Sequence, residues 1–214
     1  MRLHHSPFSA NARRAVMTAL HLGLVRDENE GVGPRVELVV VDLKAGQQRT
    51  PAYLKLNPNG RVPTLEDGNF ALTESHAIMQ YLADLTPGQT IYPTELRARA
   101  NVNRWLFWNA HHFAPAVAVL NREYNVKKIL GLGDPDPKEV ERGNQLVTQC
   151  ITVLDAHLAG REWVAEDKVT LADLALSTPL ANAASAHVPM ESATNLQRWL
   201  ARVQELSAWK KSGM

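Results

Sequence analysis

The residues of this chain that could do chemistry lie in short polar turns that precede predicted helices. Ser9 comes directly before one such helix, and Glu74 and Ser75 open another. The first turn of a helix presents free backbone N–H groups and a partial positive charge, so it can bind an anion. Hydroxyl groups placed there add hydrogen-bond donors to the same anion. Capping of the helix is the structural alternative for these side chains, since serine is a preferred capping residue.

The composition argues against several other kinds of site. The 214 residues carry 23 basic and 22 acidic side chains, for a net charge of +1, so we expect neither nucleic acid nor a membrane as a partner. The single cysteine, Cys150, can form no internal disulfide and rules out a cysteine-rich zinc site. Adjacent histidines at 4–5 and 111–112 point their side chains apart, so we predict no metal site. We also find neither a signal-peptide core nor an apolar run of ~20 residues, which favours a cytoplasmic protein.

Strand and helix signals alternate over residues 1–84. The alternation follows from runs of β-branched residues and from apolar residues spaced three or four apart. The predicted order is strand 2–5, helix from 12 to about 20, strand 36–41, a short helix from 51, strands 62–66 and 70–72, and a helix from 75. This order predicts a small α/β layered domain.

Residues 85–94 read as a linker, and residues 95–214 read as an all-helical domain. Prolines and glycine punctuate the linker. A long helix is predicted from Glu95 to about Phe113, where Pro115 kinks or ends it. Further helices are predicted to begin at the capping sequences 136–139 and 170–173, with a last helix at 195–209.

Four short sequences, taken in order, carry a resemblance to a known family. They are SPFSANARR at 6–14, NPNGRVP at 57–63, LTESHAI at 72–78 and VTLAD at 169–173. Each is weak alone, but four in order at fitting spacing are a strong signal over nearly the whole chain. Together they resemble the cytosolic glutathione transferase superfamily, in its serine-type classes such as phi, theta and related bacterial enzymes. The resemblance implies an α/β thioredoxin-like N-terminal domain that binds glutathione, plus an all-α C-terminal domain that supplies most of the second-substrate pocket.

The resemblance implies that Ser9 is the catalytic residue, as a hydrogen-bond donor to the glutathione thiolate. A free cysteine thiol titrates near ~8.5, and donors at a helix N-terminus can supply the ~2.7 kcal/mol that lowers this pKa by two units. Ser6 is the competing serine, but it lies closer to the strand. Asn11 is the second candidate donor, with a polar first-turn residue as its alternative role. The chain has no tyrosine before Tyr53 and no cysteine in the first helical turn, which argues against the tyrosine-type classes and against mixed-disulfide chemistry.

The resemblance assigns the cysteinyl and γ-glutamyl parts of glutathione to two other segments. Val62–Pro63 is implied to have a cis peptide bond, which turns the Val62 backbone outward to pair with the cysteinyl residue. An ordinary trans turn is the alternative. Glu74 is implied to bind the γ-glutamyl amine, and Ser75 with the helix N–H groups its carboxylate.

The glycine carboxylate of glutathione is assigned to the segment before the short helix at 51. Gln48 offers amide donors there, and Arg49 offers a planar donor fork that suits a carboxylate. Gln47 is the alternative if the loop is shifted by one residue.

A second-substrate pocket is expected between the two domains, a usual location for ligand pockets. Its candidate residues are Phe8, Trp105, Trp108 and His112. By spacing, the last three share a face of the long helix. Packing between helices is the alternative role of the tryptophans.

The resemblance implies an enzyme that transfers glutathione, as a cosubstrate, to small hydrophobic electrophiles, with detoxification as its role. The resemblance also implies a homodimer. Two alternatives stay open. One is a glutathione-dependent peroxidase, dehalogenase or isomerase with the same site, and the other is a non-catalytic interaction module with this fold. The intact set of Ser9, Val62–Pro63 and Glu74–Ser75 argues against the second alternative.

Overall fold

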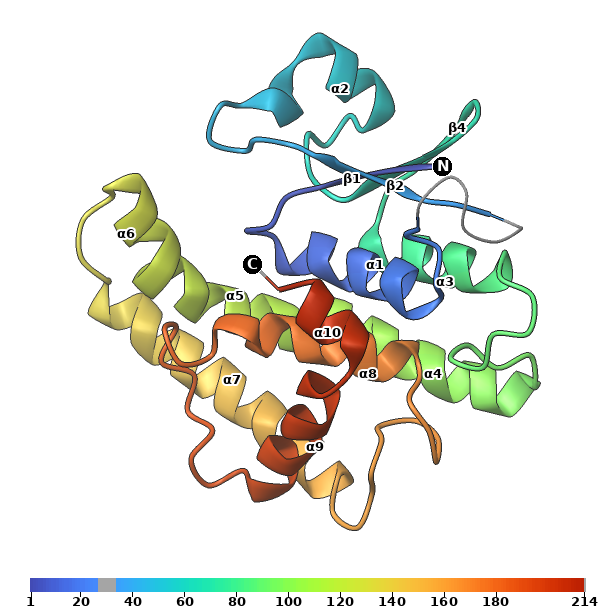
Figure 1. The fold of residues 1–214 in the computed structure, drawn as a ribbon. Coiled ribbons are helices and arrows are strands. Elements are labelled where there is room, and N and C mark those ends of the chain that lie inside the picture. Colours follow the sequence, from blue (N-terminus) through green and yellow to red (C-terminus); the bar gives the residue numbers. More distant parts are fainter. Residues whose placement is uncertain (27–33, 214) are drawn as a thin grey trace. The chain divides into compact units, whose positions relative to one another are not determined.

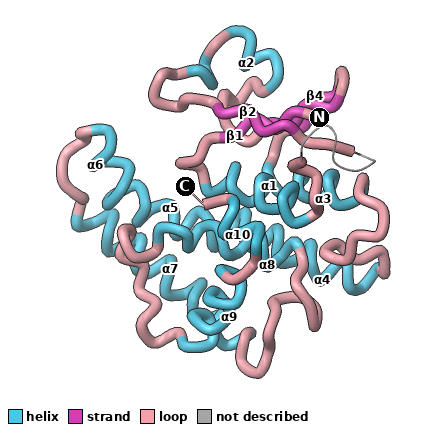
Figure 2. Tube along the Cα trace, in the orientation of Figure 1, coloured by secondary structure: helices cyan, strands magenta, loops and turns pink. Residues whose placement is uncertain are grey.

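The computed structural model describes residues 1–26 and 34–213, which divide into two compact units. The first unit is Met1–Tyr92 together with Glu205–Met214, and the second is Pro93–Gln204. Figure 2 shows that, among the described residues, all strands lie in the first unit. An α/β unit and a helical unit are therefore present, as the sequence predicts.

A four-stranded mixed sheet forms the framework of the first unit. Its strands, in the spatial order β2-β1-β3-β4, are β1 (Arg2–His5), β2 (Glu37–Val40), β3 (Thr64–Asp67) and β4 (Phe70–Leu72). β1 runs parallel to β2, with Leu3 opposite Leu38, and antiparallel to β3, with Leu3 opposite Leu65. β3 and β4 form the predicted hairpin, whose turn contains Gly68 at a φ of 60°. Glycine suits this position because a positive φ carries no steric penalty for it.

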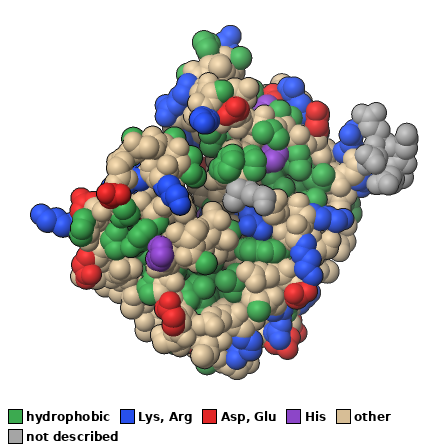
Figure 3. Space-filling view, turned by 60° about the vertical axis from the view of Figure 1, so that its left-hand side comes forward, with side chains coloured by type: hydrophobic (Ala, Val, Ile, Leu, Met, Phe, Trp, Pro, Cys, Tyr) green, Lys and Arg blue, Asp and Glu red, His purple; other side chains and the backbone are tan. Residues whose placement is uncertain are grey.

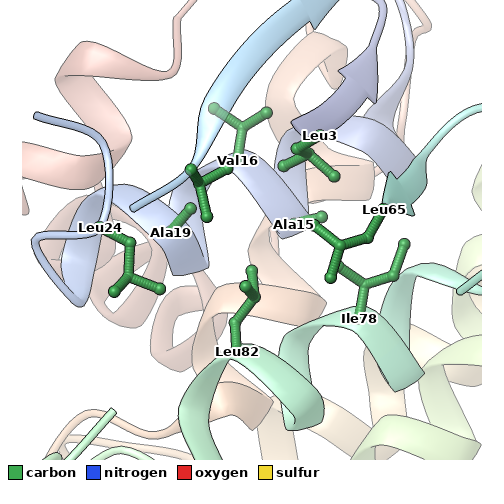
Figure 4. Packing of buried hydrophobic residues seen from close by; sticks show 9 residues of the cluster. Leu3, Ala15, Val16, Ala19, Leu24, Leu65, Ile78 and Leu82 are labelled. Atoms are coloured by element: carbon green, nitrogen blue, oxygen red, sulfur yellow. The ribbon is translucent and has the colours of Figure 1, made fainter. Parts of the chain in front are cut away.

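Helices lie on both sides of this sheet. α1 (Ala10–His21) and α3 (Ser75–Asp84) lie on one side, while α2 (Pro51–Leu56), preceded by the 3-10 turn η1 (Gln47–Arg49), lies on the other (Figure 1). Figure 4 shows aliphatic side chains of α1 and α3 meeting those of the sheet. The fully buried members are Leu3, Ala15, Ala19, Leu65, Ile78 and Leu82. Each buried leucine or isoleucine contributes about 1.5–3 kcal/mol, so this cluster fixes α1 against α3.

The last helix belongs to the first unit. α10 (Ser207–Lys211) packs on α1. The guanidinium of Arg13 lies 4.0 Å from the centroid of the Trp209 ring, and it donates hydrogen bonds to the Trp209 carbonyl and the Ser212 hydroxyl, both at 3.2 Å. The compact units therefore differ from the predicted domain 95–214 in residues 205–214, because these contacts hold the chain end against α1.

The second unit is built from helices. They are α4 (Leu96–Trp108), the π-helical turn η2 (Asn109–Phe113), α5 (Ala114–Asn121), the π-helical turn η3 (Arg122–Val126), α6 (Lys127–Leu130), α7 (Pro137–His157), α8 (Leu171–Ser177), the 3-10 turn η4 (Thr178–Asn182) and α9 (Thr194–Gln204). α5 packs along α7, α4 packs along α8, and α9 contacts both α7 and α8. The predicted start of α7 is confirmed, since Asp136 accepts a hydrogen bond from the Lys138 N–H and Pro137 is in the first turn.

Pro115 does not end the long helix that precedes it. The helix widens instead into the π-helical turn η2, and α5 continues directly from it. Proline lacks the N–H that would bond back to the carbonyl one turn earlier, and a wider turn accommodates this missing bond. The predicted irregularity near Phe113 is therefore a π-turn rather than a break.

A buried carboxylate ties the loops of the second unit to its helices. Asp173, in the first turn of α8, accepts hydrogen bonds from the Val164 N–H at 2.9 Å, the Thr170 N–H at 2.8 Å and the Trp199 indole N–H at 2.9 Å. The Thr170 hydroxyl caps α8 in return, so the predicted capping box at 170–173 is confirmed. Burial raises the pKa of the Asp173 carboxyl, and the donors around it act in the opposite direction.

Charges of both signs lie close together on the surface. On the face drawn in Figure 3, lysine and arginine side chains are interspersed with aspartate and glutamate. None of the helices described is long and apolar enough to cross a membrane. Within residues 1–26 and 34–213, no three metal-ligating side chains form a group that could hold an ion.

The Asp173 contacts predict a large effect of Asp173→Ala on stability. The substitution leaves three buried N–H donors without their acceptor, which should lower the free energy of unfolding by at least about 3 kcal/mol. Asp167→Ala is the matched control, because Asp167 is exposed in the loop before α8 and its loss should change stability by less than about 0.5 kcal/mol. Denaturant unfolding measures both effects, and equal losses in the two variants would contradict this role of Asp173.

Candidate functional site

The turn before α1 positions Ser9 at the N-terminus of that helix. Ser9 has an extended backbone, and its hydroxyl oxygen accepts a hydrogen bond from the Ala12 N–H at 3.2 Å. Its own N–H donates to the Ser6 carbonyl at 3.1 Å, which closes the turn. The capping alternative is therefore observed. Capping uses only a lone pair of the hydroxyl, so the O–H of Ser9 stays able to donate to a ligand.

The polar residues in and next to this turn differ in their exposure to solvent. Ser6 is only 2% exposed, whereas Ser9 is half-buried and Asn11 is exposed. Phe8 is 77% exposed. Of the two serines, Ser9 is thus the one that a ligand at the end of α1 can reach.

The loop before β3 has a fixed shape. The Val62–Pro63 peptide bond is cis, which confirms the prediction for it. Asn57, 2% exposed, donates hydrogen bonds from its side-chain amide to the Arg61 carbonyl at 2.9 Å and to the Thr64 hydroxyl at 3.1 Å. One buried amide therefore bonds to the residues on either side of the cis Val62–Pro63 pair, Arg61 before it and Thr64 after it.

At the start of α3, the side chain of Glu74 is exposed and that of Ser75 is buried. Glu74 has a φ of 66°, in the left-handed region that costs a non-glycine residue about 1–3 kcal/mol and that is often found at functional sites. Its side chain makes no capping bond and is exposed, so the capping alternative does not describe it. Ser75 is buried, and its hydroxyl oxygen accepts a hydrogen bond from Arg14 of α1 at 3.3 Å.

These three segments enclose a small pocket of about 60 Å³ in the first unit. Its lining residues are Asn11, Asn57, Asn59, Arg61, Val62, Pro63, Glu74 and Ser75. Five of the residues predicted from the sequence thus meet in one place. Asn57, Asn59 and Arg61 are additions that sequence reasoning missed. The predicted turn at 57–60 was their signal, because an asparagine at the start of such a turn often bonds back to the backbone that follows.

The charges of the pocket suit a small zwitterion. Arg61 offers a cation, Glu74 offers a carboxylate, and Ser75 adds a hydroxyl at the N-terminus of α3. An amino-acid head group carries one carboxylate and one ammonium, so each of its charges finds a partner of opposite sign. The volume of the pocket accommodates such a head group and leaves the remainder of a larger ligand outside.

Gln48 and Arg49 lie beside this pocket rather than in its lining. Arg49 is exposed, and the Gln48 side chain donates a hydrogen bond to the Leu43 carbonyl at 3.3 Å. Gly60 connects the two regions, because a Cβ at this residue would lie 3.0 Å from the Gln48 carbonyl oxygen and 3.3 Å from Cδ of Arg49. Gln47 lines a separate depression on the side of the sheet that faces α2.

Three of the four residues predicted for a second substrate, Trp105, Trp108 and His112, form a row in the second unit, whereas Phe8 belongs to the first. Trp105 is 5% exposed, and its ring centroid lies 5.3 Å from that of Trp108 and 4.6 Å from that of His157. The core alternative therefore describes Trp105. Trp108 is half-buried and stacks on Phe113, while His112 is exposed with its ring 6.4 Å from Trp108.

Comparison with known proteins is consistent across the chain. A family model described as "Glutathione S-transferase, N-terminal domain" matches residues 3–90, and a second one, described as "Glutathione S-transferase, C-terminal domain", matches residues 137–202. The chain is 36% identical over 176 residues to glutathione S-transferase theta-2B of Homo sapiens, a match that covers 80% of this chain and 71% of that protein. It is 29% identical over 216 residues to glutathione S-transferase F10 of Arabidopsis thaliana, covering 97% and 94% of the two chains.

The fold agrees with a solved structure of the same kind. Glutathione transferase F7 from Populus trichocarpa matches with a TM-score of 0.85 at 25% identity, over 99% of this chain and 96% of that one. The sequence matches and the structural match thus indicate the same family for both units. The chain therefore belongs to the glutathione S-transferase family, a family of transferase enzymes that use glutathione as co-substrate.

Proposed function

We propose that this protein conjugates the thiolate of glutathione to small hydrophobic electrophiles. The pocket at the starts of α1 and α3 carries this proposal, because it gathers a cation, a carboxylate and a hydroxyl around a helix N-terminus. The γ-glutamyl end of glutathione is a zwitterionic amino-acid head group. Ser75, the N–H groups of α3 and Arg61 bind its carboxylate, and Glu74 binds its amine. Asn11 adds a polar contact from α1.

The rest of the tripeptide extends from this pocket along the cis-proline loop. The backbone of Val62, next to Pro63, pairs with the cysteinyl residue as an added strand would. Gln48 and Arg49 bind the glycine carboxylate, and their proximity to Gly60 on this loop supports that role. The planar donor fork of an exposed arginine suits a terminal carboxylate.

Ser9 stabilises the thiolate by donating its O–H to the sulfur, and it is not itself a nucleophile. Its accessible position at the N-terminus of α1 supports this role, as does the free O–H that capping leaves. The thiol proton leaves to solvent, and the sulfur lone pair forms a bond to an electrophilic carbon. In substitution the leaving group departs with its bonding electrons. In addition the displaced π electrons take up a proton.

Aromatic side chains supply the surface for the electrophile. Phe8 is exposed in the turn before α1, and Trp108 with His112 offers an accessible aromatic row in the second unit, backed by Trp105. Such surfaces suit small hydrophobic molecules better than charged ones. Detoxification is the role that we propose for such a reaction, and the cytoplasm is its proposed location.

We also propose a homodimer. Leu96 is 79% exposed and Phe107 is 63% exposed, and they lie on the same face of α4 because they are about three helical turns apart. Large exposed apolar side chains on one helix face are typical of a surface that binds a partner. A second copy of the chain is the partner that the family relationship favours.

The conjugation itself predicts a simple assay. The protein should be retained on immobilised glutathione and should convert chlorodinitrobenzene and glutathione to the thioether, with release of chloride. Absorbance of the thioether measures the rate. Absence of binding at millimolar glutathione would contradict the proposal. Binding without conjugation would favour a peroxidase, dehalogenase or isomerase, or a non-catalytic module.

The thiolate role of Ser9 predicts a shift in pH dependence for Ser9→Ala. A donor to the sulfur lowers the pKa of bound glutathione, so its loss should raise that pKa by about one to two units, equivalent to ~1.4–2.7 kcal/mol. Activity should then be lost near neutral pH and recovered at higher pH, with the dissociation constant for glutathione nearly unchanged. Ser6→Ala is the matched control and should leave the profile in place. A shift in Ser6→Ala instead would reverse the assignment.

The exposed face of α4 predicts the effect of Phe107→Glu on assembly. The wild-type protein should sediment as a dimer of 23.7 kDa chains, and a charge at residue 107 should convert it to monomer at micromolar concentration. Val153→Glu is the control, because Val153 is 52% exposed on a different helix, α7. A monomeric wild type, or dissociation by both variants alike, would contradict this interface.

A further inference from the structure

Arg14 is an unusual residue for the interior of a helix pair. It is 2% exposed and is among the largest fully buried side chains of the protein. Arginine is almost never fully buried unless its charge and its donors are used. Burial lowers the pKa of Arg14 to about 9, which still leaves the guanidinium charged at neutral pH.

The guanidinium of Arg14 contacts the first turn of α3. Its Nη1 donates to the Ser75 hydroxyl oxygen at 3.3 Å and lies 3.3 Å from Nε2 of His76. A guanidinium has only donors, so both of these atoms must act as acceptors. Ser75 therefore keeps its single O–H proton for another partner. Since Ser75 lines the pocket, a ligand atom that accepts hydrogen bonds can take this proton.

Arg14 also joins the two ends of the proposed glutathione site. It belongs to α1, the helix that Ser9 caps, and it reaches α3, the helix that Ser75 opens. Arg13, the next residue back along the chain, is similarly buried at 8% exposure but contacts α10 instead. The two arginines thus offer a comparison within one helix, with similar burial and different partners.

We propose that Arg14 is a positioning residue for glutathione, which holds the Ser75 hydroxyl as a donor to the γ-glutamyl carboxylate. This inference rests on the proposed function. Arg14 does not touch the substrate. It orients the Ser75 O–H toward the pocket and adds a fixed positive charge behind it, which favours an anionic group over a neutral one at this position.

The role of Arg14 predicts a loss of preference for the carboxylate rather than a general loss of binding. Two ligands test it: glutathione, and an analogue with a 4-aminobutyryl group in place of the γ-glutamyl residue, which lacks only that carboxylate. Calorimetry should show that Arg14→Met raises the dissociation constant for glutathione about tenfold. The constant for the analogue should stay within about twofold of wild type, because the contact that Arg14 supports is already missing. Arg14→Lys, which keeps a charge and a donor, should recover part of the loss.

Matched variants separate positioning from folding. Arg13→Met should lower the melting temperature by weakening the α10 contact, yet it should keep the preference for glutathione over the analogue. Ser75→Ala should lose the preference, and adding Arg14→Met to it should cause no further loss. If Arg14→Met does not fold, Arg14→Lys takes its place: Ser75→Ala is then compared with the double variant that carries both Ser75→Ala and Arg14→Lys.

Two results would overturn the role of Arg14. One is that both Arg14 variants keep the wild-type preference for glutathione over the analogue. The other is that the dissociation constants of both ligands rise by the same factor. Failure of the wild-type protein to bind glutathione at all is a different result, because it would remove the proposed function and this inference with it.

Discussion

The packing of α1 against α3 beneath the sheet sets the distance between two helix N-termini. Ala15 of α1 and Ile78 of α3 belong to the aliphatic cluster that includes Leu3 and Leu65 of the sheet. A close-packed interior resists small shifts, so neither helix can slide without opening a cavity. Each N-terminus carries a partial positive charge, and both belong to the unit that holds the pocket. The anion-binding groups of the site are therefore held in place before a ligand arrives.

Several features of the site are unfavourable to folding by themselves. Glu74 adopts a left-handed backbone, Arg14 buries a charge, and the Asn57 amide is withdrawn from water. Such local conflicts persist only where the surrounding structure over-determines them. Here the hydrogen bonds of Asn57 and the α1–α3 contact supply that support. Glu74 and Asn57 line the pocket, and Arg14 contacts Ser75, which also lines it.

Local signals in the sequence predicted much of this structure. Thr50, Asp136 and Thr170 each cap the helix that their sequence context indicated, and the hairpin formed at Gly68 as expected. These features depend on neighbours within a few residues, which a single sequence displays. The pocket segments were also predicted, from turn residues before β3 and before the helices α1 and α3 together with the family resemblance.

The remaining features depend on contacts that a single sequence does not display. The place of the chain end on α1 comes from Arg13 and Trp209, which are far apart in the chain. Arg61 lines the pocket because of the bent shape of the loop before β3. The Gln48 side chain donates a hydrogen bond to the Leu43 carbonyl in its own loop. The central claim is that a prebuilt pocket holds glutathione by its γ-glutamyl end. A crystal structure of the glutathione complex tests it most directly. We predict the γ-glutamyl carboxylate on Ser75 and the sulfur within hydrogen-bond distance of Ser9. A tripeptide bound elsewhere, or with its ends reversed, would contradict the claim.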